Sequence, residues 1–140
     1  MLVFTGCKEE TYTPEPLPQI TISGIVYADL DLNTANDKAP VGTKIIFRID
    51  SRDLVQTPIT GYTYNVIEYT TTVGADGAYT ITLPTATFAG VNVDIIPVDF
   101  QNDQIQIDNS RKLMTYIGGL SGVTTQSNQR YFQDLAYVAI

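Results

Sequence analysis

The sequence predicts an all-β protein, a single antiparallel β-sandwich of seven strands with Greek-key connections. Three observations lead to this prediction. Apolar residues recur at every second position in several runs, these runs are rich in β-branched and aromatic residues, and Gly, Pro, Asn and Asp separate them. No run has the length and period of an amphipathic helix. A chain of 140 residues is long enough for one domain with its own apolar core.

The first strand, 20–28, is expected because Ile20, Ile22 and Val26 lie at alternate positions. The three strands that follow are runs of the same kind, at residues 42–50, 61–73 and 77–83. Asp76-Gly77 stands between the third and fourth strands, and Asp-Gly supplies the positive φ of a tight turn. The sequence therefore predicts a hairpin at this point.

The fifth strand, 90–100, changes the parity of its apolar residues near Pro97. Because proline donates no backbone hydrogen bond, this change favours a bulge on an edge strand. The last two strands are expected at 111–117 and 130–139. The final one either closes the sheet of its own chain or is offered to a neighbouring molecule, with the flexible loop 118–122 as its hinge.

The charged residues and the missing residue types exclude several functions. The chain has 15 acidic and 8 basic residues, so its net charge of −7 disfavours binding to nucleic acid. It has no histidine, which excludes catalysis by imidazole. A glycosidase needs two convergent carboxylates, and the spacing of Asp94, Asp99, Asp103 and Asp108 does not show that any two converge. We therefore expect no enzymatic activity.

The N-terminal segment carries the most specific motif. Residues 1–6 run from apolar to small and are followed by Cys7, the only cysteine of the chain. This order resembles the lipobox of bacterial lipoproteins. The resemblance implies that residues 1–6 are the end of a signal peptide and that Cys7 carries diacylglycerol on its sulfur and an acyl group on its nitrogen.

The residues after Cys7 extend this interpretation. Lys8, Glu9 and Glu10 resemble the surface-export signal of Bacteroidetes lipoproteins. The resemblance implies a lipid-anchored protein on the outer face of the outer membrane. Prolines alternate with other residues at positions 14–18, so residues 7–18 are expected to form a semi-rigid tether before a sandwich domain at 19–140.

Three segments of the domain resemble strands of carboxypeptidase-regulatory-like, transthyretin-like domains. These segments are Ile22–Asp29, Ala39–Ile45 and Thr72–Ile81. The resemblance covers roughly residues 20–98 and implies a seven-strand Greek-key sandwich, transthyretin-like or Ig-like, that serves as a stalk, spacer or adhesion module. It implies no catalysis.

One loop has oxygen ligands at alternate positions, as calcium-binding loops do. The candidate metal ligands are Asp29, Asp31, Asn33 and Asp37. The pattern matches only the first three ligands of an EF-hand loop, because Thr34 stands in place of glycine and Pro40 in place of glutamate. Asp and Asn that hydrogen-bond their own backbone are the alternative explanation.

Tyrosine is abundant, with nine residues, and Tyr62 and Tyr64 are expected to share one strand face. They either fill the core or form an exposed platform for a glycan or a protein. The sequence as a whole predicts a non-enzymatic, lipid-anchored module of a cell-surface assembly with a protein partner. The alternatives are a glycan- or Ca²⁺-binding module and a pilus or fibre subunit.

Overall fold

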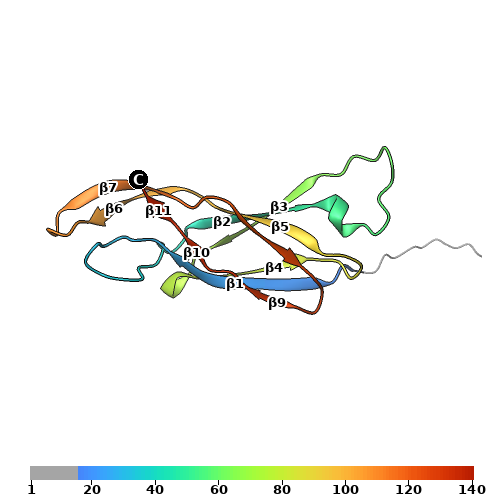
Figure 1. Ribbon diagram of the computed structural model, residues 1–140, viewed down its shortest axis with the longest axis horizontal. Coiled ribbons are helices and arrows are strands. Elements are labelled where there is room, and N and C mark those ends of the chain that lie inside the picture. Colours follow the sequence, from blue (N-terminus) through green and yellow to red (C-terminus); the bar gives the residue numbers. More distant parts are fainter. Residues whose placement is uncertain (1–15) are drawn as a thin grey trace, which may run out of the picture.

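The strands form three small sheets, two of which face each other across the apolar core (Figure 1). The computed structural model describes residues 16–140. The first sheet consists of β10 (Leu135–Ala136) and β9 (Arg130–Phe132) on one side of β1 (Gln19–Tyr27), and β4 (Ala78–Pro84) on the other. The second sheet has the order β3 (Val66–Thr72), β2 (Lys44–Asp50), β5 (Val91–Pro97), β8 (Ser121–Thr125). The third has the order β11 (Val138–Ala139), β7 (Arg111–Ile117), β6 (Phe100–Ile105).

The predicted all-β class is confirmed. Between residues 16 and 140 the helical elements are two short 3-10 helices, η2 (Ser51–Leu54) and η3 (Ala75–Gly77). The number of strands differs from the prediction, because this range holds eleven strands in place of seven. The strand expected at 130–139 is divided into three, and β6 and β8 were not predicted.

The core confirms the predicted side-chain alternation. Ile20, Ile22 and Val26 of β1 are buried, and so are Val91, Val93 and Ile95 of β5. These residues bring together the inner faces of the first and second sheets, with burial of their apolar surface as the main stabilising contribution. The rings of Phe47 on β2 and Tyr79 on β4 lie 6.0 Å apart between the two sheets.

The Asp76-Gly77 turn connects two different sheets. Both residues have the expected positive φ, 58° and 75°. However, β3 pairs with β2 and β4 pairs with β1, so the predicted hairpin is wrong. One side-chain bond, from Thr71 Oγ1 to the carbonyl oxygen of Thr80, links the two strands at 2.9 Å. The turn conformation was predicted correctly because it depends on two adjacent residues, whereas strand pairing depends on residues far apart in the chain.

A long hairpin runs through the second and third sheets, with β5 and β6 in one arm and β7 and β8 in the other. Ile95 pairs with Ser121 before the bend and Phe100 pairs with Tyr116 after it. Four residues separate these pairs on each arm, 96–99 and 117–120, so neither arm has an extra residue. The predicted bulge is therefore wrong, and β5 is an interior strand between β2 and β8.

The two arms of this hairpin approach each other closely at the bend. A Cβ atom on Gly118 would collide with the Pro97 ring and lie 3.0 Å from its Cγ atom. The bend also explains the predicted parity change, because the buried residue is the odd-numbered Pro97 on β5 and the even-numbered Gln104 on β6. The loop 118–122, expected to be a hinge for the last strand, belongs to this bend and to β8.

The C-terminal segment crosses from the first sheet to the third. β9 and β10 run parallel to β1 in one register, with Thr21 opposite Arg130 and Val26 opposite Leu135. β11 then pairs antiparallel with β7, with Val138 opposite Ile117. The strand expected at 130–139 thus pairs within its own chain, on two different sheets.

Candidate functional site

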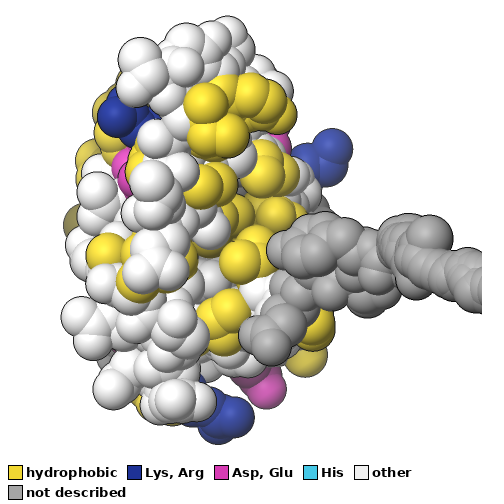
Figure 2. All heavy atoms as spheres, turned by 90° about the vertical axis from the view of Figure 1, so that its right-hand side faces the viewer, with side chains coloured by type: hydrophobic (Ala, Val, Ile, Leu, Met, Phe, Trp, Pro, Cys, Tyr) yellow, Lys and Arg dark blue, Asp and Glu magenta, His cyan; other side chains and the backbone are white. Residues whose placement is uncertain are grey.

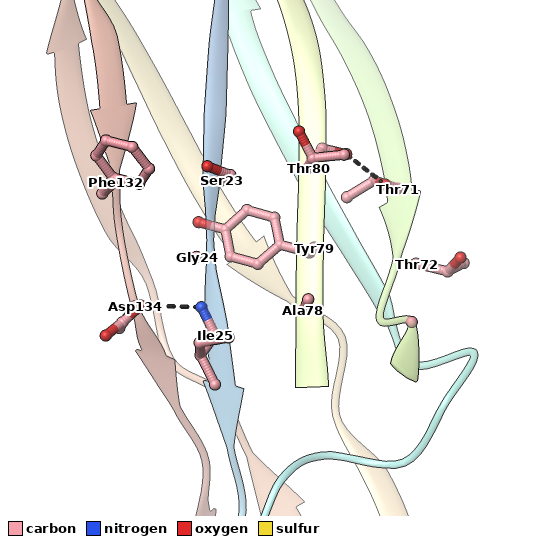
Figure 3. Close-up of a pocket in the computed structure, with 11 residues that line it drawn as sticks. Ser23, Gly24, Ile25, Thr71, Thr72, Ala78, Tyr79, Thr80, Phe132 and Asp134 are labelled. Atoms are coloured by element: carbon pink, nitrogen blue, oxygen red, sulfur yellow. Dashed lines mark hydrogen bonds between the residues drawn. The ribbon is translucent and has the colours of Figure 1, made fainter. Parts of the chain in front are cut away.

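A groove of about 630 Å³ lies over β1, β4 and the C-terminal segment (Figure 3). Its floor consists of short side chains, Ser23 of β1 and Ala78 and Thr80 of β4. These residues lie at outward-facing positions of their strands, between the buried positions of the core. The floor is therefore open because small residues alternate with the apolar residues that hold the sheet.

The two walls of the groove differ in chemistry. Phe132 of β9 forms one wall with 73% of its surface exposed, and Asp134 lies on the same side. Thr71 and Thr72 of β3 form the opposite wall (Figure 3). The groove thus presents an aromatic ring, several hydroxyl groups and one carboxylate. This combination suits binding to an extended ligand by stacking and hydrogen bonds.

Asp134 has a structural role in the wall. Its Oδ1 atom accepts a hydrogen bond from the backbone N–H of Ile25 at 2.9 Å. The N–H of Gln133 still donates to the carbonyl oxygen of Ser23 at 2.8 Å, and the bond to Asp134 follows it in the interval between β9 and β10. The side chain therefore keeps the C-terminal segment in register with β1 while the segment bends around the groove.

Tyr79 fixes the same segment from beneath the groove. Its ring passes Gly24 on β1, and its hydroxyl donates a 2.5 Å hydrogen bond to the carbonyl oxygen of Gln133. Burial, followed by the negative charge of Asp134, raises the pKa of Tyr79 to about 12. The hydroxyl consequently remains protonated and able to donate even above its ordinary pKa of 10. Gly24 is required here, because a side chain would collide with the Gln133 backbone.

The loop predicted to bind calcium folds on its own hydrogen bonds. Asp31 Oδ1 accepts from the N–H of Asn33, and Asp37 Oδ2 accepts from the N–H of Asp31, both at 2.9 Å. Asn33 Nδ2 donates to the carbonyl oxygen of Gln106 at 3.0 Å. Within residues 16–140, no group of three or more Asp, Glu, His or Cys side chains is arranged to hold a metal ion. The arrangement shows how these residues shape the loop, and calcium binding stays a prediction.

Asp29, the first of the four candidate ligands, lies beside Asp37 in a hollow of about 270 Å³. Partial burial, the charge of Asp37 and a hydrogen bond with Asp37 raise the pKa of Asp29. The backbone carbonyl of Asp29 accepts bonds from Gln104 Nε2 and Tyr116 Oη, both at 2.9 Å. These two hydrogen bonds therefore connect the Asp29 carbonyl to β6 and β7 of the third sheet.

Tyr62 and Tyr64 lie side by side, although not on a strand. β3 begins at Val66, so the predicted strand 61–73 is shorter and both tyrosines belong to the loop before it. Their ring centroids are 4.8 Å apart, and Tyr64 Oη accepts a 3.0 Å hydrogen bond from the N–H of Ile59. Tyr62 is 63% exposed and so does not fill the core, and a ligand platform at these two tyrosines stays a prediction.

The residues of the predicted anchor, Cys7, Lys8, Glu9 and Glu10, lie outside the described residues. The sequence did not reveal the groove, because its residues come from segments around 23, 79 and 133 that only the fold brings together. One signal was available for Phe132. It alternates with Tyr131, which packs against the core, and an aromatic residue at the opposite parity must face outward.

The chain has little similarity to known proteins. No protein-family model and no curated protein matches it. A 9R-lipoxygenase from Cyanothece PCC8801 is among the solved structures with some likeness, with a TM-score of 0.36 and 11% sequence identity. The aligned part covers 93% of this chain and 18% of the lipoxygenase. In the described part of the chain, no helix has the length and hydropathy needed to span a membrane.

Proposed function

We propose that this protein is a non-enzymatic, lipid-anchored interaction module on the outer face of a bacterial outer membrane. Cys7 is the observation that carries the proposal, because small residues precede it and Lys8, Glu9 and Glu10 follow it. Two or more acyl chains on one residue provide a stable membrane hold. In this proposal, residues 7–18 form the tether and the domain after them makes the contacts.

The groove supports an interaction role for the domain. It offers one exposed aromatic ring, Phe132, above a floor of small side chains. Among its lining residues Asp134 is the carboxylate, and its Oδ1 atom already accepts a backbone hydrogen bond. Such a lining suits recognition of a partner segment. We also propose that the two facing sheets are a variant of the transthyretin-like Greek-key sandwich, extended by the third sheet.

The location can be tested on native cells. Mass spectrometry of the native protein should show that Cys7 is the first residue and that it carries acyl chains. Protease added to intact cells should digest the domain, whereas periplasmic marker proteins should stay intact. An unmodified Cys7, or a domain protected until the outer membrane is permeabilised, would contradict the proposal.

A surface glycan-binding module is the second candidate. The groove favours it, because Phe132 can stack on a sugar ring while the hydroxyls of Ser23 and Thr80 face the same space. Binding to the native state raises the melting temperature. A glycan panel should therefore include a compound that stabilises the wild type and not Phe132→Ala. No stabilisation by any compound would remove this candidate.

A further inference from the structure

The two ends of the domain differ in charge. One end is formed by loops 16–18, 51–65, 85–90 and 126–129. These loops lie together because the start of β1 pairs with the end of β4, and the start of β5 pairs with the ends of β2 and β8. We call this the tether end. Its loops contain one acid, Asp53, and one base, Arg52. The loops of the opposite end, 28–43, 73–77 and 106–110, contain one base and five acids: Lys38, Asp29, Asp31, Asp37, Asp76 and Asp108.

The tether end also exposes apolar side chains. Ile59 and Tyr62 have 66% and 63% of their surface exposed, and Leu17, Val55 and Phe88 are exposed to a smaller extent. Figure 2 looks at this end directly: hydrophobic side chains are spread across its face, and the charged side chains in view lie toward its rim. A face with few charges, exposed apolar side chains and an exposed tyrosine is typical of surfaces that lie at the boundary of a lipid bilayer.

We propose that the tether end rests on the lipid surface, with Ile59 and Tyr62 inserted among the headgroups. This inference depends on the proposed anchor at Cys7. Nine peptide units join Cys7 to Pro16, so the tether end lies within about 30 Å of the anchored residue. The nine residues of β1 add about 30 Å between the two ends.

The distribution of charge favours one orientation of the domain on the membrane. Lipid surfaces that carry negative charge repel acidic groups within a Debye length. With Lys44, Arg111 and Lys112 of the adjoining strand ends counted, the opposite end has five acids and four bases, and this excess of negative charge favours the orientation that points it away from the membrane. The tether end, with one charge of each sign, meets no such repulsion. Anchor position and charge thus favour the same orientation.

Tryptophan fluorescence can test this orientation, because the chain contains no tryptophan. The full chain is attached through Cys7, its only cysteine, to vesicles that contain a maleimide lipid and lipids with brominated acyl chains. Tyr62→Trp and Ile59→Trp report on the tether end. Ile107→Trp, at a position 76% exposed in the acidic end, is the matched control.

We expect the emission of Tyr62→Trp and Ile59→Trp to fall roughly twofold and shift to shorter wavelength, because bromine quenches only a nearby indole. Ile107→Trp should keep its emission. Adding Ile59→Glu to Tyr62→Trp should reduce the quenching, whereas adding Ile107→Glu should leave it unchanged. Equal quenching at both ends, or none at the tether end, would overturn the proposal.

The chemical attachment separates this inference from the proposed function. If native Cys7 proves to be unmodified, the lipoprotein proposal fails even when the vesicle-attached protein shows the expected quenching. If Cys7 is acylated and the tether end is not quenched, the anchor stands and the orientation is wrong.

Discussion

Gly24 is the position of β1 where one added methyl group should perturb the domain most. It faces the core side of the sheet, and the backbone of Gln133 and the ring of Tyr79 occupy the space beside it. In Gly24→Ala, the Cβ atom would overlap the Gln133 carbonyl group, 2.7 Å from its carbon, and would lie 3.1 Å from Tyr79 Cε1. The C-terminal segment would have to move away from β1.

The cost can be worked out from three contributions. Overpacking against a backbone atom costs about 1–3 kcal/mol. Loss of the bond between Tyr79 and Gln133 adds about 1 kcal/mol. Replacing a strand glycine by alanine raises the free energy of unfolding by about 0.5–1 kcal/mol. The free energy of unfolding should therefore fall by about 1–3.5 kcal/mol, which corresponds to a decrease in melting temperature of roughly 3–14 °C.

Urea denaturation and thermal melting of purified Gly24→Ala measure this effect. Gly74→Ala is the matched control, because its added Cβ atom would meet its nearest neighbour, the Ala78 carbonyl oxygen, at an ordinary 3.5 Å and its backbone is extended. The control should be as stable as the wild type or more stable by up to about 1 kcal/mol. A Gly24→Ala protein as stable as the wild type would refute the argument that Gly24 makes room for the C-terminal segment.

Three further predictions concern titration, the acidic loop and a buried polar pair. Because the pKa of Tyr79 is raised to about 12, the unfolded chain loses this proton at a lower pH than the folded protein does, so the stability that the shift contributes should be present below pH 10 and lost as pH rises toward 12. Denaturation midpoints measured across this range should show the decline, and Tyr79→Phe should flatten it. Asp37→Ala should lower the free energy of unfolding by about 1–2 kcal/mol, because the N–H of Asp31 loses its acceptor; a melting temperature that rises with millimolar calcium in the wild type would instead show that the loop binds the ion. The hydroxyls of Thr85 and Thr125 bond each other at 3.0 Å in the core, so Thr85→Val should cost about 1 kcal/mol, and the double change to Val should cost less than the two single changes added together.

The inner faces of the strands could be predicted from the sequence because burial repeats every second residue within one strand. Ile20, Ile22 and Val26 show this on β1. The pairing of strands could not be predicted in the same way, because partners are far apart in the chain. Asp76-Gly77 illustrates the limit: its backbone conformation follows from the two residues, whereas the strands on either side pair with β2 and β1.

The candidate sites show the same division between local and distant information. The motif around Cys7 is contiguous, so the sequence suffices to predict an anchor. The groove needs Ser23, Thr80 and Phe132 together, and these residues become neighbours only when β9 pairs with β1. Tyr62 and Tyr64 were predicted to be neighbours for the wrong reason, because a loop and not a strand brings their rings together.

The parallel pairing of β1 with β9 and β10 has a mechanical consequence. If the tether pulls on the start of β1 while a load pulls on the chain beyond β10, the two strands are drawn past each other along their length. The hydrogen bonds between them then share the force at the same time and must break together. A domain connected in this way should resist stretching between a membrane and a moving partner far better than one whose bonds open one after another.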